Sequence, residues 1–188
     1  NTTIIDGDSN GTVISFEDYE TNASVVCGFT IQNGSASGIK ISSSSPVLKN
    51  LVIEDCTVEG SGGGISALYA HWEGIQSNLI LDNIRFYNNT ATGPDSRGGG
   101  LHLFSGEGSL LTNLTFSNNI SHKGGGIHLQ SDGFGTIDIH SSTFYNNIST
   151  GSQGSSLWAR SVDKVNIYNS IFWSHPETGF QICSSYVP

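Results

Sequence analysis

Short apolar runs, separated by small polar residues, repeat along this chain at a nearly constant step. Phe86, Phe116, Phe144 and Phe172 mark the repeat, at intervals of 30, 28 and 28 residues. Each of the first three opens a Phe-x-Asn-Asn block, and a block rich in Gly or Ser follows before the next apolar run. Self-similarity at a fixed period of this size is typical of stacked structural repeats.

Within a full repeat, apolar and polar residues alternate in three short segments, which predicts three strands. In one repeat these are the segment around Leu81, then Ile84-Arg85-Phe86, then Leu101-His102-Leu103. Because side chains alternate across a strand, Ile84, Phe86, Leu101 and Leu103 should point inward, about 4.8 Å from like residues of the next coil. The pattern predicts an all-β parallel β-helix, a solenoid of about seven coils with three short strands per coil.

Asparagines form two columns in register with the Phe column. The first lies between the first and second strands, and the second ends the second strand; the members are Asn50, Asn83, Asn113 and Asn169, and then Asp6, Asn33, Asp55, Asn88, Asn118 and Asn146. Asn tolerates left-handed backbone at tight corners, and stacked amides can hydrogen-bond from coil to coil. We therefore predict asparagine ladders. In each Phe-x-Asn-Asn block, the Phe and the first Asn are expected to face inward.

The paired Phe-x-Asn-Asn and Gly-Gly-Gly-Ile or Gly-Gly-Gly-Leu blocks are similar to those of right-handed parallel β-helix repeat proteins. They also resemble the FxxN and GGA[I/L] repeats of bacterial polymorphic outer-membrane proteins, although this chain has GGG in place of GGA and Gly154-Ser155-Ser156 in one copy. The resemblance covers nearly the whole chain. It implies a right-handed helix and a secreted or surface-displayed bacterial or archaeal protein, often adhesin-like and sometimes active on carbohydrates.

Composition and charge narrow the classes of function. Only 12% of residues are charged, and the formal net charge is −9, so no basic cluster is present to bind nucleic acid or anionic membranes. No apolar run approaches the roughly 20 residues of a membrane helix. The three cysteines, Cys27, Cys56 and Cys183, are expected to be isolated thiols. Asn-x-Ser/Thr sequons occur along the chain, among them those that begin at Asn1, Asn22, Asn88, Asn113, Asn119 and Asn147.

One stretch fits a calcium-binding loop. Asp6, Asp8 and Asn10 alternate before Gly11, and Glu17 stands at the twelfth position, in the manner of an EF-hand loop. No helices flank this stretch, and Asp6 also belongs to an asparagine column. A calcium ion here is therefore an alternative to a purely structural role, and no other cofactor is expected.

The outer face of the strands that follow the glycines is the candidate ligand site. Outward positions there place His102, His128 and Trp158 in one column, with Phe104, Gln130 and Arg160 beside it. Aromatic rings can stack on sugar faces, and His or Arg can donate hydrogen bonds or act as a base. A structural alternative is that these side chains only cover the sheet. A metal on His102 and His128 would lack a third ligand fixed by the pattern.

An enzyme would use the same face. For a polysaccharide lyase or epimerase, the catalytic candidates are His102, His128 and Arg160. A glycosidase needs two carboxylates, and only residues expected in loops, such as Asp95, Glu107 and Asp132, could supply them. An insertion over residues 70–74 adds an exposed Trp72 that could bind a ligand or pack over a coil edge.

Two hypotheses follow. The first is a non-catalytic extracellular or cell-surface module, a scaffold or adhesin that binds glycans; the second is the lyase or epimerase. Long loops that would wall a cleft are few, which favours the first. We expect one domain over residues 1–188, cut from a longer chain, whose open sheet edges are covered by flanking sequence or by end-to-end self-association.

Overall fold

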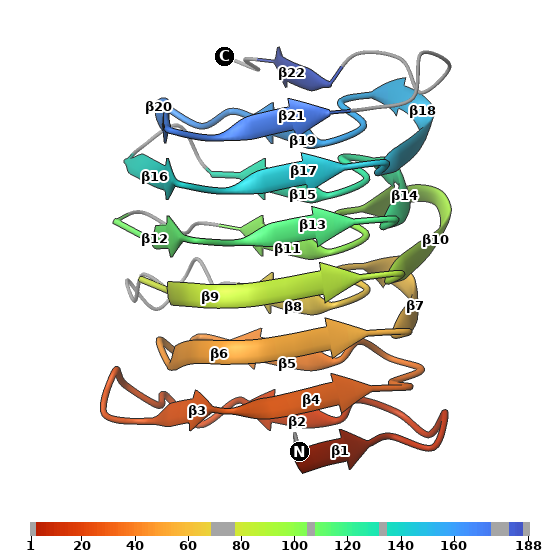
Figure 1. Ribbon diagram of the computed structural model, residues 1–188, viewed down its shortest axis with the longest axis vertical. Helices are drawn as coiled ribbons and strands as arrows, with labels where there is room; N and C mark the ends of the chain where they lie inside the picture. The colour runs from red at the N-terminus through yellow and green to blue at the C-terminus, as the bar shows by residue number, and fades with distance from the viewer. Residues whose placement is uncertain (1–2, 69–77, 105–107, 132–134, 174–180, 186–188) are drawn as a thin grey trace.

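The computed structural model describes residues 3–68, 78–104, 108–131, 135–173 and 181–185. In these parts the chain winds into a right-handed parallel β-solenoid of about six turns, whose coils stack along one axis (Figure 1). Every strand pair in the described residues is parallel. The predicted fold class is therefore confirmed.

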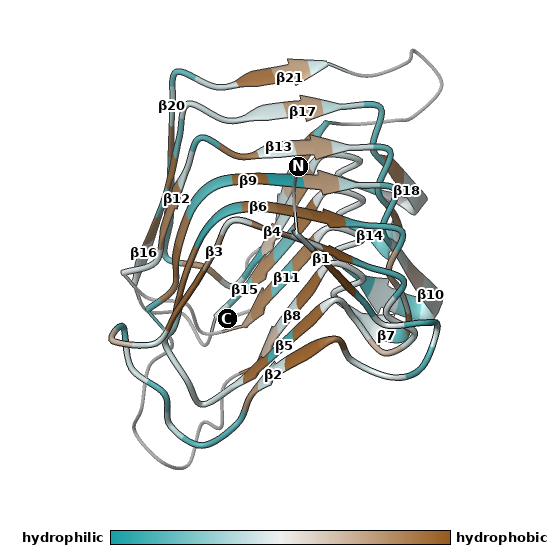
Figure 2. Cartoon of the chain, turned by 60° about the horizontal axis from the view of Figure 1, so that its bottom comes forward, coloured by the Kyte–Doolittle hydropathy of each residue, from teal (hydrophilic) through white to brown (hydrophobic). Residues whose placement is uncertain are grey.

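Three sheets make the sides of the coil, as the end view shows (Figure 2). Sheet A holds eleven strands within the described ranges: β1 (Thr3–Asp6), β3 (Val25–Cys27), β4 (Phe29–Gln32), β6 (Val47–Glu54), β9 (Ile80–Tyr87), β12 (Leu110–Thr112), β13 (Thr115–Ser117), β16 (Thr136–His140), β17 (Thr143–Tyr145), β20 (Lys164–Tyr168) and β21 (Ile171–Trp173). Sheet B holds seven: β2 (Ile14–Phe16), β5 (Ile39–Ser42), β8 (Ile65–Leu68), β11 (Leu101–Phe104), β15 (Ile127–Gln130), β19 (Leu157–Arg160) and β22 (Ile182–Ser185). Sheet C holds four: β7 (Thr57–Ser61), β10 (Thr90–Arg97), β14 (Ile120–Lys123) and β18 (Ile148–Gln153).

The three-sided coil matches the expectation, but its sides are assigned differently. The first and second expected strands lie in one sheet, A, which bends at the first asparagine column; β9 runs unbroken through Asn83. The third side is sheet C, built from segments such as 90–97 that were expected to be loops. This finding matters for the site, because sheet C runs directly into sheet B through the glycine blocks.

The core is a set of columns of like residues. Ile84, Phe86, Leu101 and Leu103 are all at most 2% exposed, as predicted. The Phe86 and Phe116 rings stack with centroids 4.4 Å apart and planes 3° from parallel, and the stack continues through Phe144 to Phe172. Stacked rings at this spacing join neighbouring coils by close apolar contact.

The predicted asparagine ladders are present at the corners. The first-column residues Asn50, Asn83 and Asn113 have φ of 54°, 52° and 55°, in the left-handed region. The Nδ2 of Asn113 donates to Asn83 Oδ1 at 3.1 Å, and that of Asn83 donates to Asn50 Oδ1 at 2.8 Å. In the second column, Asn146 Nδ2 donates to Asn118 Oδ1 at 2.7 Å. These bonds satisfy the polar corners between coils.

A third ladder lies inside the core, and it corrects the expectation that the first Asn of each block faces inward. Asn88 is exposed, whereas Asn89, Asn119 and Asn147 are 0% exposed. Asn89 Nδ2 donates to Asn119 Oδ1 at 3.1 Å, and Asn119 Nδ2 donates to Asn147 Oδ1 at 2.9 Å. The left-handed turn at the first Asn shifts the alternation by one residue, so the second Asn points inward.

Cys56 continues the buried ladder toward the N-terminus. Its backbone N–H donates to Asn89 Oδ1 at 3.2 Å, and its thiol contacts the N–H of Gly34 at 3.5 Å. Burial raises the pKa of this thiol to about 11, so it stays protonated at neutral pH. All three cysteines are free thiols, as expected.

In the described ranges, no helix is both apolar and long enough to cross a membrane.

Candidate functional site

The glycine blocks connect sheet C to sheet B by a tight turn. Gly98, Gly124 and Gly154 have φ of 61°, 65° and 57°. A Cβ at Gly98 would lie 2.1 Å from the carbonyl oxygen of Leu101, so no side chain fits there. The turn reverses the chain within a few residues. It brings the residues before the blocks, at the ends of the sheet C strands, close to the outward side chains of sheet B, as Lys123 is to Trp158 and Arg97 to His102.

The predicted column on sheet B exists in register. His102 pairs with His128, and His128 pairs with Trp158, on β11, β15 and β19. The two imidazole centroids are 4.9 Å apart, and the His128 and Trp158 ring centroids are 4.6 Å apart. The sequence therefore located these three side chains correctly with respect to each other.

The column is not open to solvent, and the expectation of an exposed face is wrong for its three members. His102, His128 and Trp158 are 3%, 0% and 6% exposed. They lie under a second row, formed by residues at the ends of the sheet C strands: Arg97, Lys123 and Gln153, which pair with one another in register. The Nζ of Lys123 is 5.5 Å from the centre of the Trp158 ring. We call these two rows the covered column.

The other predicted ligand-binding residues are less deeply buried. Phe104, Gln130 and Arg160 are half-buried at the ends of their strands. Arg160 contributes positive charge near His128, and Gln130 Oε1 is buried with no hydrogen-bond partner in the part of the chain that the structure describes. Whether any residue of this face binds a ligand or acts in catalysis stays a prediction.

The imidazoles inside the covered column are neutral. Burial, with the nearby charge of Arg97, lowers the pKa of His102 to about 3. Burial also lowers the pKa of His128 strongly, assisted by His102, Arg97, Arg160 and Lys123. Among the described residues, no ring nitrogen of either histidine has a hydrogen-bond partner. In the folded state these side chains therefore do not take up a proton near neutral pH.

The covered column ends in an open hollow of about 480 Å³. In the third coil, serines occupy the positions that correspond to the two rows of the covered column. Ser61 stands before the glycines, and Ser66 stands after them. Serine is too small to fill the layer, so the chain leaves a space there that is lined by Lys40, Glu59, Ser61, Ser66, Arg97 and His102, among others. Sequence reasoning missed this hollow, although serines at two positions filled by large residues elsewhere are a readable signal.

The calcium loop is not supported by the geometry. Asp6 accepts hydrogen bonds from Asp8 N, Asn33 Nδ2 and Gln32 Nε2, which lower the pKa of its carboxyl group. Glu17 instead forms an ion pair with Lys40 at 2.5 Å. No group of three His, Cys, Asp or Glu residues is arranged for a metal in the described part of the chain. The structure thus does not bring Asp6, Asp8, Asn10 and Glu17 together.

Several loop residues named for an enzyme cannot be placed. Glu107, Asp132 and the insertion 70–74 with Trp72 lie outside the described residues. Asp95 lies on β10 and pairs with Lys123 at 2.9 Å, which lowers the pKa of its carboxyl group. Asp95 is thus a largely exposed ion-pair partner of Lys123.

An exposed group of side chains on sheet A was not foreseen as a site. Tyr145, Tyr168, Ile171 and Trp173 are 50%, 47%, 60% and 66% exposed in the last two coils. Tyr145 and Trp173 are register partners on β17 and β21, and Tyr168 stacks on His140 with centroids 4.7 Å apart. We call the four residues the aromatic patch. The strand alternation marks them as outward, which was the available signal.

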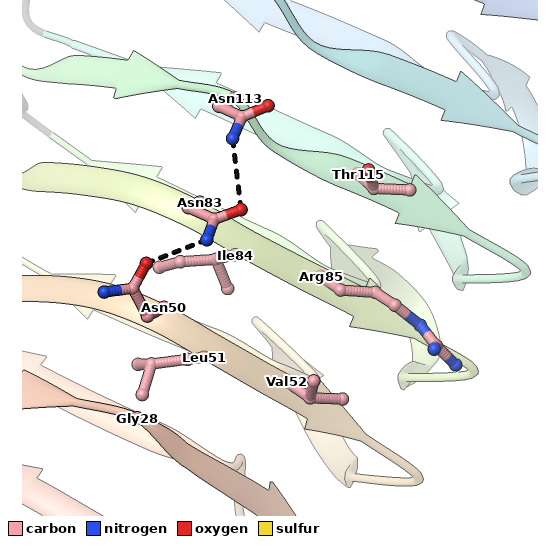
Figure 3. A pocket seen from close by; sticks show the side chains of 9 residues that line it. All are labelled: Gly28, Asn50, Leu51, Val52, Asn83, Ile84, Arg85, Asn113 and Thr115. Carbon is pink, nitrogen blue, oxygen red and sulfur yellow. Dashed lines mark hydrogen bonds between the residues drawn. The ribbon is translucent and has the colours of Figure 1, made fainter. Parts of the chain in front are cut away.

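A shallow groove of about 440 Å³ follows the corner of sheet A (Figure 3). Asn50, Asn83 and Asn113 run along it, joined by the two ladder bonds, and Gly28 lies at its end. The amides bond mainly to each other, so this groove is explained as architecture.

Comparison with known proteins bears on the fold. Residues 19–186 match the family described as the right handed beta helix region. This chain belongs to that family. Searches for similar curated proteins and for similar solved structures found no significant match. Membership in the right-handed β-helix family accords with the sheet topology and does not by itself assign an activity.

Proposed function

We propose that this β-helix is a non-catalytic extracellular or cell-surface module that binds neutral glycans on its aromatic patch. The observation that carries the proposal is the exposure of Trp173 and Tyr145 side by side on a rigid sheet. Exposed apolar groups of this kind mark interaction sites on soluble proteins. Aromatic rings offer flat apolar faces against which sugar rings pack.

The rigidity of the support favours binding without a cleft. Tyr145 and Trp173 project from strands whose inward residues, Phe144 and Phe172, belong to the stacked core. Register pairing places the two outward side chains about 4.8 Å apart, on neighbouring coils. A preformed surface of this kind loses little conformational entropy when it binds a ligand.

The lyase or epimerase hypothesis is less well supported by the same structure. A general base must come within hydrogen-bond reach of the proton that it removes. His128 is 0% exposed, and its pKa is strongly lowered by burial, so a polymer outside the solenoid does not reach it in this conformation. Half-buried Arg160 alone does not supply a complementary acid.

The surface location rests on the family resemblance of the Phe-x-Asn-Asn and glycine blocks. Many coils built from Asn, Ser, Thr and Gly, with only 12% charged residues, form a rod that can hold a binding patch away from its attachment point. The low charge and the rod shape both accord with a scaffold or adhesin-like module.

A binding screen with matched variants tests the proposal. Neutral and acidic polysaccharides are compared by affinity electrophoresis, and uronate cleavage is followed in parallel. Trp173→Ala should weaken retention by a neutral glycan at least about 10-fold, the loss of one well-placed aromatic contact. Tyr87→Ala is the control, because Tyr87 occupies the same outward column but lies under Arg85, 4.8 Å from its ring centre. Retention that survives Trp173→Ala, or turnover lost on His128→Ala, would refute the proposal.

A further inference from the structure

The hollow at the end of the covered column is lined by buried nitrogen atoms that have no hydrogen-bond partner in the described ranges. Arg97 Nε and both ring nitrogens of His102 are buried, and none has a hydrogen-bond partner among the described residues. His102 is 97% buried and lines the hollow together with Arg97. A buried polar group that stays unpaired costs about 1–3 kcal/mol, so such a group calls for a partner.

The charges around the hollow indicate whether that partner is an anion or a cation. Arg97 forms no ion pair within the described residues, whereas Lys40 is already paired with Glu17. One acidic residue, Glu59, is exposed at the lining. Because the guanidinium of Arg97 meets no acidic partner in the described parts of the chain, it leaves its side of the hollow locally positive, within a chain of net charge −9.

The arrangement of the hydrogen-bond donors indicates which kind of ligand fits the hollow. A guanidinium presents several N–H groups in a fixed fork that matches an oxyanion, and a neutral imidazole can offer one N–H in either tautomer. Ser61 and Ser66 add hydroxyl groups to the same lining. Coordination of a metal cation is disfavoured here, because the charge of Arg97 opposes a second positive charge next to His102.

We propose that this hollow is a binding site for a single phosphate or sulfate group, held by Arg97 and His102 with the serine hydroxyls at its entrance. The group is either a free inorganic anion or an ester on a glycan, and both share the same oxyanion chemistry. The site lies on sheet B and is separate from the aromatic patch. Its test therefore has an outcome that is independent of the proposed glycan binding.

Calorimetric titration with sodium sulfate and sodium phosphate, against sodium chloride at equal ionic strength, measures the binding. Arg97→Gln keeps a polar amide but shortens the side chain and removes the charge, and it should weaken binding by about 10-fold or more. Arg85→Gln is the matched control, because Arg85 is half exposed on sheet A and pairs with Glu54 there. Trp173→Ala should leave sulfate binding unchanged.

Nitrogen NMR of the histidines keeps the test valid even if Arg97→Gln does not fold. Sulfate should shift the ring signals of His102 in the unaltered protein and leave those of His140 in place. A sulfated oligosaccharide that binds more tightly than inorganic sulfate, with no binding of its desulfated form, would assign the source to a glycan ester; equal binding would assign it to the free anion. No heat with either anion and no movement of His102 would overturn the proposal, as would equal affinity of the Arg97→Gln variant.

Discussion

Acid should destabilise this solenoid through two histidines that the fold keeps neutral. His102 and His128 have folded pKa values below the ordinary value of 6.5, because both are buried under the row of Arg97, Lys123 and Gln153. A lowered pKa means that the unfolded chain binds protons that the folded chain does not. The stabilising contribution is thus complete above about pH 6.5 and is lost as the pH falls below it.

The magnitude follows from the unfolded state. At pH 5, an imidazole with a pKa near 6.5 is protonated about 30 times more often than not, which favours unfolding by about 2 kcal/mol. This free-energy difference does not depend on the pKa in the folded state, as long as that pKa lies well below 5. For His102 the folded-state pKa is about 3. The two histidines together should therefore remove about 4 kcal/mol, a large share of the stability of a typical domain.

Urea denaturation at pH 7.5, 6.0 and 5.0 measures this loss of unfolding free energy. The loss is calculated from the shift of the denaturation midpoint, with the slope against urea concentration held constant. Replacing both His102 and His128 by Phe should abolish most of the pH dependence, whereas His140→Phe on the outer surface should leave it intact. The carboxyl groups of Asp6 and Asp95 have lowered pKa values, so they change the unfolding free energy only below their ordinary pKa of 3.8. That pH lies outside the measured range. An unfolding free energy that is equal within about 1 kcal/mol at pH 7.5 and 5.0 would refute the reasoning.

Three further predictions concern the ladders. Asn119→Ala should lower the unfolding free energy by about 4 kcal/mol, because it leaves several buried groups unpaired, whereas Asn83→Ala at the exposed corner should cost about 1–2 kcal/mol; paired urea curves that show equal losses would contradict this. Cys56→Asn should raise the unfolding free energy by about 1 kcal/mol by extending the buried ladder toward Gly34, and a lower denaturation midpoint would count against it. In a host that N-glycosylates, the folded protein should carry no sugar at Asn119, although Ser121 completes a sequon there; a glycopeptide at Asn119 in protein with the native midpoint would show the prediction to be wrong.

The repeating parts of the fold could be predicted because each coil presents the same environment to the same residue types. The Phe column and the corner asparagines follow from that repetition. The inward asparagine was misassigned because strict alternation from Phe86 points to Asn88, whereas the left-handed turn at that residue moves the phase to Asn89.

The cover over the histidines could not be predicted from alternation. Residues 90–97 contain Gly93 and Pro94 and little apolar content, yet they form β10 because the backbone pairs from coil to coil. Alternation indicates only whether a side chain faces the core, and it is silent on whether a second strand lies over the outer face. Long polar or charged residues directly before three of the blocks, at Arg97, Lys123 and Gln153, were the available signal.

The polarity of the ladders has an electrical consequence. The buried amides donate from Asn89 to Asn119 to Asn147, toward the C-terminal end, while the corner amides donate from Asn113 to Asn83 to Asn50, toward the N-terminal end. Aligned amide dipoles add along a row, so the two rows oppose each other. The second corner column also donates toward the N-terminal end, from Asn146 to Asn118, so the opposition is only partial and each added coil leaves a net side-chain dipole along the axis.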